Sequence, residues 1–153
     1  MGKENLVIFR NLFLPGRNDV ESPWFHYRWS HQLLEETDNY VIEGYRNSGK
    51  SSIVFNAYHL YCLAYPDESR AFILLICHDE SMASERLGEI KETYKSNPLI
   101  NLNLVKINED NSDTFEAVVK DENDKDVRMR VKAVGKGSSV RIVTGKQIGR
   151  AHV

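Results

Sequence analysis

The sequence has few cysteines and no long apolar run. Its 153 residues include only two cysteines, Cys62 and Cys77, and both lie in apolar surroundings. Two buried thiols are therefore favoured over a disulfide or a metal pair. No apolar stretch approaches the roughly 20 residues needed to cross a bilayer. The first residues, from Met1 to Leu6, lack both the apolar core of a secretory signal and the myristoylation pattern. These absences predict a cytoplasmic protein with no membrane segment.

Acidic residues are missing from one end of the chain. The formal net charge is −2, so the surface as a whole is not that of a nucleic-acid-binding protein. From Val127 onward, however, there is no Asp or Glu, and the basic residues are Arg128, Arg130, Lys132, Lys136, Arg141, Lys146 and Arg150. The favoured interpretation is a set of solvent-facing side chains on strands, and contact with a phosphate backbone is the alternative.

The chain length and hydrophobic content, 41%, fit one soluble domain with a core of its own. Residues 3–14 are apolar and could form either a strand or a helix. Ser22 and Pro23 predict the start of an amphipathic helix that continues to about Glu36. The order that follows alternates strands with helices: strand 40–43, helix 52–65, strand 71–77, helix 79–96 and strand 102–107. Such alternation indicates an α/β domain.

The sequence supports more specific predictions for several of these segments. The helix at 52–65 is apolar on nearly every side, which is typical of a helix in the middle of a layered domain. The run from Ala71 to Cys77 is continuously apolar and predicts a strand covered on both faces. Runs at 114–120 and 127–134 surround an acidic turn and predict a β-hairpin at the edge of the sheet. A glycine-rich loop at 135–139 then precedes a further strand that begins at Val140.

The most informative motif lies between residues 44 and 51. The stretch Gly-Tyr-Arg-Asn-Ser-Gly-Lys-Ser matches the phosphate-binding loop pattern GxxxxGK[ST], and it stands between a predicted strand and a predicted helix. Backbone N–H groups of such a loop and the helix N-terminus form an anion site. The nine predicted nucleotide-binding residues are Gly44, Tyr45, Arg46, Asn47, Ser48, Gly49, Lys50, Ser51 and Ser52.

Each of the main positions has a chemical role in this prediction. Gly44 and Gly49 let the backbone approach phosphate oxygens closely, because neither has a Cβ. Lys50 supplies charge to the β- and γ-phosphates of ATP, and the Ser51 hydroxyl is a ligand for Mg²⁺. Arg46 could reach the γ-phosphate as a catalytic arginine, or it could point into solvent. ATP and Mg²⁺ are the expected cofactors.

The sequence has few candidates for the acidic residues of a hydrolytic site. A hydrolase also needs carboxylates at the end of a later strand, and only Asp79 and Glu80, after the 71–77 strand, resemble such a pair. Asp79 is better placed as the N-cap of the next helix. His26 and His31 stand on one helix without a third ligand, so packing or surface roles are favoured over metal binding. Gln32 could contact adenine, although its spacing does not require it.

The order of these segments resembles the N-terminal ATPase part of the large terminase subunit of tailed phages. The loop has an arginine ahead of Gly-Lys-Ser, and the following strand and helix carry a pattern that ends in Asn97-Pro98. A glycine-rich turn then leads into Ser139-Val140-Arg141. The resemblance covers about residues 22 to 141. It implies a P-loop NTPase-like fold, in which helices flank a mostly parallel central sheet, with an antiparallel hairpin toward the C-terminus.

The resemblance also implies a function and a set of partners. The family couples ATP hydrolysis to translocation of double-stranded DNA into a procapsid, as a ring that works with the portal protein and the small terminase subunit in the host bacterium. Residues 1–141 would form a partial ATPase domain, and residues 142–153 depart from the family and are expected to be a non-native or disordered tail. The family's acidic pair and its nuclease domain have no counterpart here, so little or no activity is expected. The alternatives are a small complete NTPase or kinase that uses Asp79 and Glu80, or a non-enzymatic nucleic-acid-binding fragment.

Overall fold

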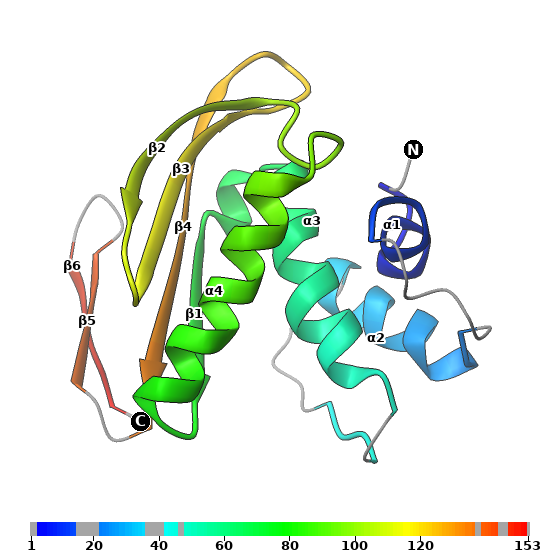
Figure 1. Cartoon of the computed structure of the whole chain (residues 1–153), viewed down its shortest axis with the longest axis horizontal. Coiled ribbons are helices and arrows are strands. Elements are labelled where there is room, and N and C mark those ends of the chain that lie inside the picture. The colour runs from blue at the N-terminus through cyan, green and yellow to red at the C-terminus, as the bar shows by residue number, and fades with distance from the viewer. Residues whose placement is uncertain are drawn as a thin grey trace.

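The structure is a computed structural model that describes residues 3–14, 22–35, 42–45, 48–136, 139–143 and 147–152, the last two ranges by backbone only. A four-stranded sheet stands at one side of the molecule, with α4 (Glu80–Ser96) lying against it. Beside α4 lies α3 (Tyr58–Ala64), and α1 (Leu6–Phe13) and α2 (Trp24–Glu35) lie beyond α3 (Figure 1). The helices therefore form successive layers on one side of the sheet.

The N-terminal apolar segment is a helix. Asn5 caps α1 by accepting a hydrogen bond from the Ile8 N–H at 2.8 Å, and the Leu6 N–H donates to Ser30 Oγ of α2, also at 2.8 Å. Because the first N–H groups of a helix lack partners within it, these two bonds both start α1 and attach it to α2. The predicted helix at 22–36 is confirmed as α2.

The helix after the loop is present but unusual in its first turns. Residues Ser51–Ala57 form a π-helix, η1, which continues directly into α3. Every residue of α3 from His59 to Ala64 is buried, which confirms the expectation of a helix surrounded by other layers. Arg86 of α4 lies 5.5 Å from the centre of the Phe55 ring and so holds η1 against α4.

The sheet is mixed rather than mostly parallel, which corrects the sequence-based expectation. Its strands are β1 (Phe72–Cys77), β2 (Leu104–Asp110), β3 (Thr114–Lys120) and β4 (Asp126–Gly135), in the order β1-β4-β3-β2. Only β1 and β4 pair in parallel, and the other two pairs are antiparallel. The short turns at 111–113 and 121–125 can join only antiparallel neighbours, so they fix this arrangement.

Two finer expectations about the strands are also wrong. The predicted hairpin β3–β4 exists, but it occupies the centre of the sheet, because β1 and β2 pair with its outer sides. Strand β1 is an edge strand and is not covered on both faces. Its Leu75 and Cys77 are buried, whereas Ile76 is 48% exposed. The apolar run in β1 therefore exceeds what burial on one face requires.

The strand expected before the loop is not found among the described residues. Residues 40 and 41 lie outside them, and Ile42–Tyr45 have no regular secondary structure. After the loop, the chain reaches the sheet through η1, α3 and the turn that leads into β1. In Figure 1 the described part of the loop lies at the same end of the molecule as the carboxyl ends of β1 and β4.

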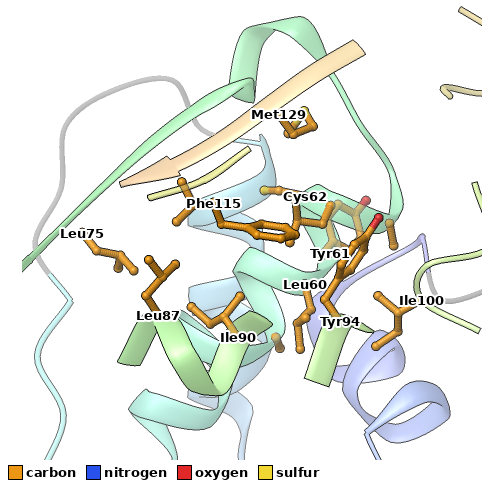
Figure 2. Close-up of a cluster of buried hydrophobic side chains, with 14 of the residues drawn as sticks. Leu60, Tyr61, Cys62, Leu75, Leu87, Ile90, Tyr94, Ile100, Phe115 and Met129 are labelled. Carbon is orange, nitrogen blue, oxygen red and sulfur yellow. The ribbon is translucent and has the colours of Figure 1, made fainter. Parts of the chain in front are cut away.

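The core is formed where α3 and α4 meet the inner face of the sheet. Figure 2 shows Phe115 and Met129 of the sheet facing Leu87, Ile90 and Tyr94 of α4. Phe115 and Tyr94 are fully buried and make an edge-to-face contact with ring centroids 5.9 Å apart. Both cysteines are buried free thiols, as predicted.

The remaining elements lie at the periphery. A short 3₁₀ turn, η2 (Glu68–Arg70), joins α3 to β1. Strands β5 (Ser139–Val143) and β6 (Gln147–His152) form a separate two-stranded antiparallel sheet, so residues expected in the tail take part in strand pairing. Across the described residues, no helix combines the length and hydrophobicity needed to cross a membrane.

Candidate functional site

The phosphate-loop motif forms a tight turn that leads straight into a helix. The Ser48 N–H donates to the Tyr45 carbonyl at 3.1 Å, and Gly49 then adopts a φ of +85°. From Lys50 the backbone is right-handed helical, and the Ile53 N–H donates to the Gly49 carbonyl at 3.0 Å. The described end of the motif therefore turns at Gly49 into a helix, as predicted, whereas the strand predicted before the loop is not found among the described residues. Arg46 and Asn47 lie outside the described residues.

The two glycines are required by close contacts as well as by the turn. A Cβ on Gly44 would lie 2.5 Å from Ser48 Oγ and 3.2 Å from the Trp29 ring. A Cβ on Gly49 would lie 2.6 Å from His26 Nε2, in addition to the strain that its positive φ imposes on any side chain. Both glycines face α2, so this helix forms one wall of the loop.

The start of the helix after the loop has no side-chain cap. Lys50 occupies the N-cap position of η1, and its own side chain makes no capping hydrogen bond. Among the described residues, Lys50 also has no ion-pair partner, although its side chain is half-buried. Uncapped N–H groups beside a lysine favour an anion.

Ser48 adds a polar atom inside the loop. The residue is only 5% exposed, and its Oγ has no hydrogen-bond partner among the described residues. The short separation from the position of a Gly44 Cβ shows that this hydroxyl points across the loop. A buried hydroxyl without a partner is costly, so this atom is available to a bound polar group.

His26 connects α2 to the loop. Its Nε2 lies 2.6 Å from the Ser48 carbonyl oxygen, and the ring packs against Phe25 and Trp29. Burial lowers the pKa of His26, although the bond to the Ser48 carbonyl opposes that shift and nearby Arg10 adds to it. A neutral ring that donates from Nε2 satisfies these surroundings. Of the packing or surface roles expected from the sequence, packing fits this placement.

Arg10 brings a buried positive charge near the same helix. It is 5% exposed, and its Nη1 lies 3.5 Å from Ser52 Oγ, while its Nη2 donates to Ser22 Oγ. Arg10 was not among the site residues predicted from the sequence. The available signal was an arginine among the apolar residues 6–14, since a charged side chain on a buried helix face needs a specific environment.

A pocket of about 690 Å³ opens beside the loop. Its walls come from α2 and from the loop, including Gly44, Tyr45 and Ser48. Aromatic side chains are prominent in this pocket, and two of them, Trp24 and Tyr45, are 75% and 70% exposed. The remaining lining residues are Phe25, Arg28, Trp29, Gln32, Ile42 and Glu43. Exposed aromatic faces with a few polar groups are suited to a flat heteroaromatic ligand.

Asp79, the first of the two acidic candidates, has a structural role. Asp79 is the N-cap of α4, with its Oδ1 accepting from the Met82 N–H at 2.7 Å, which confirms the capping prediction. Within the described ranges, no cluster of three His, Cys, Asp or Glu residues could hold a metal ion.

Part of the predicted basic surface is internally paired. Glu116 is almost buried and accepts from Arg130 Nη1 at 3.3 Å and from Asn108 Nδ2 at 3.1 Å. Arg128 also approaches this carboxylate, at 4.0 Å. Two of the cations on β4 are thus engaged by a carboxylate of the neighbouring strand, a pairing that the sequence did not predict.

The loop fits a magnesium–nucleotide complex on these local grounds. Lys50, the Ser51 hydroxyl and the uncapped helix start could hold a polyphosphate and its metal ion, and the unpartnered Ser48 hydroxyl lies inside the loop. Comparisons with models of protein families, with curated proteins and with solved structures yield no match.

Proposed function

We propose that this chain binds ATP with Mg²⁺ at the loop Gly44–Ser51, and that it represents the nucleotide-binding part of a DNA-packaging motor of the large-terminase type. The observation that carries the proposal is the complete phosphate-loop motif, which turns at Gly49 into an uncapped helix beside the aromatic pocket. Loop, helix start and pocket are neighbours, so one ligand with an anionic end and an aromatic end would use all three.

Each part of the site has a defined task in this proposal. Lys50 and the backbone N–H groups at the helix start neutralise the β- and γ-phosphates, and the Ser51 hydroxyl contributes to the Mg²⁺ shell. Trp24 and Tyr45 stack on the base, and Gln32 is the lining residue whose amide can pair with an adenine edge. The pocket volume of about 690 Å³ lies in the range usual for small-molecule sites.

Binding rather than turnover is the expected activity of this chain. Asp79 is occupied as a helix cap. The acidic pairs at the ends of two other strands are engaged as well: Asp110 and Glu109 of β2 pair with lysines of α4 and with Arg130, and Glu122 after β3 pairs with Lys3. Without a carboxylate to orient water, the bound nucleotide should hydrolyse only slowly. Double-stranded DNA, the portal protein and the small terminase subunit remain partners that the family resemblance implies.

Thermal unfolding with and without magnesium–ATP tests the nucleotide site. The melting temperature of the wild-type chain should rise by several degrees at a nucleotide concentration 100 times the Kd. At that concentration, a ligand that binds only the native state stabilises it by about 2.7 kcal/mol. Lys50→Ala should remove the gain. Lys106→Ala, which deletes an exposed lysine on β2, is the matched control and should keep it. Equal gains in the wild type and in Lys50→Ala would contradict the proposal.

A further inference from the structure

His26 makes two contacts with the phosphate loop, and neighbours on its own helix fix its ring. Its Nε2 lies 2.6 Å from the Ser48 carbonyl oxygen. Its ring fills the space beside Gly49, since a Cβ there would lie 2.6 Å from Nε2 and 2.7 Å from Cε1. The ring is also fixed from behind, with centroid distances of 5.1 Å to Phe25 and 5.4 Å to Trp29.

We propose that His26 is the positioning residue of the phosphate loop: it fixes the peptide between Ser48 and Gly49 in the orientation that binds phosphate. This inference rests on the proposed nucleotide-binding function. His26 does not contact the nucleotide in this account. It acts through the Ser48 carbonyl, from a helix 22 positions earlier in the chain.

The protonation state of the ring follows from its partner. A carbonyl oxygen can only accept a hydrogen bond, so Nε2 carries the proton and donates it. Nδ1 is buried and has no hydrogen-bond partner among the described residues. A second proton on Nδ1 would therefore be buried without an acceptor, and the ring is neutral with the proton on Nε2.

The hydrogen bond from His26 to the Ser48 carbonyl also fixes the direction of the Gly49 N–H, which belongs to the same peptide. In a trans peptide the C=O and the N–H point in opposite directions. Because the Ser48 carbonyl points toward His26, the Gly49 N–H points away from His26. The positive φ of Gly49 then carries the chain into the helix that starts at Lys50. Loss of the His26 bond frees this peptide to rotate, and a misoriented N–H no longer faces the anion.

Two substitutions separate the hydrogen bond from the volume of the ring. His26→Leu keeps an apolar side chain of similar size but removes the donor, whereas His26→Gln restores an N–H donor at a similar reach. His31→Leu, at an exposed position of the same helix, is the control for replacing a histidine on α2.

The first measurement is hydrogen exchange at the amides of residues 48–52 in the nucleotide-free protein. His26→Leu should exchange faster there than the wild type, and His26→Gln and His31→Leu should match the wild type. The second measurement is the Kd for magnesium–ATP by calorimetry. It should rise about tenfold in His26→Leu, the effect of one lost hydrogen bond, and recover in His26→Gln. Nitrogen-detected NMR of the wild type should find the His26 proton on Nε2.

The outcomes distinguish this inference from the proposed function. Absence of magnesium–ATP binding by the wild type would refute the nucleotide site, whatever the exchange data show. Unchanged exchange and unchanged affinity in His26→Leu would refute the positioning role while leaving the nucleotide site intact. A proton on Nδ1 in the NMR spectrum would also refute the positioning role, because the donor to Ser48 would then be missing.

Discussion

The contact between Gly49 and His26 gives a quantitative prediction about stability. Gly49→Ala introduces two separate costs. The first is the positive φ of +85°, which costs a residue with a Cβ roughly 1–2 kcal/mol. The second is the collision with the buried His26 ring, which Phe25 and Trp29 prevent from moving away, and such overpacking costs about 1–3 kcal/mol. The total destabilisation should be about 2–5 kcal/mol.

A double-mutant cycle separates the two costs. In a His26→Ala background the collision is absent, so Gly49→Ala should cost only the roughly 1–2 kcal/mol of backbone strain. The coupling between positions 26 and 49 is therefore expected to be about 1–3 kcal/mol. Urea unfolding of the four proteins, followed by circular dichroism, measures it. A coupling near zero would refute the reasoning, because it would mean that the ring and the glycine do not share this space.

Three further predictions concern the rest of the fold. Burial lowers the pKa of His59 to about 4, so the unfolded chain binds its proton first as pH falls, and stability should drop by about 3 kcal/mol between pH 6.5 and 4. His59→Leu should flatten that part of the stability profile, and an unchanged slope would exclude His59 as its source. Phe115→Ala should cost about 3–5 kcal/mol in urea unfolding, whereas Leu102→Ala, at a site 78% exposed, should change stability by less than about 0.5 kcal/mol. Asp79→Ala should cost about 1 kcal/mol through loss of the cap, while Asp79→Asn keeps a cap and should leave both stability and magnesium–ATP affinity unchanged. A loss of affinity in Asp79→Asn would instead favour the kinase alternative.

The helices were predictable because their signals are local. The Asp79 cap and the all-round apolar pattern of α3 each act within a few residues, and both are found in the structure. The Ser22-Pro23 pair marked the start of α2 to within a residue, since the helix begins at Trp24. The motif likewise predicted the turn at Gly49.

Strand pairing was less predictable because it depends on contacts between distant segments. The apolar run of β1 indicated a strand but could not indicate that its parallel neighbour would be β4, more than fifty residues later. Nor did alternation of strands and helices exclude the central antiparallel hairpin, which displaces β2 to the far edge of the sheet. The contact between His26 and Ser48 could not be predicted for the same reason, because the two residues are 22 positions apart in the chain. The available signal was a histidine next to Phe25 on an amphipathic helix.

The most direct test of the nucleotide site is a calorimetric titration of the wild-type chain and Lys50→Ala with magnesium–ATP. The proposed function predicts one saturable site in the wild type, with binding lost in Lys50→Ala, because the lysine charge faces the phosphates. Binding of equal affinity in both proteins, or no binding to a folded wild type, would contradict it.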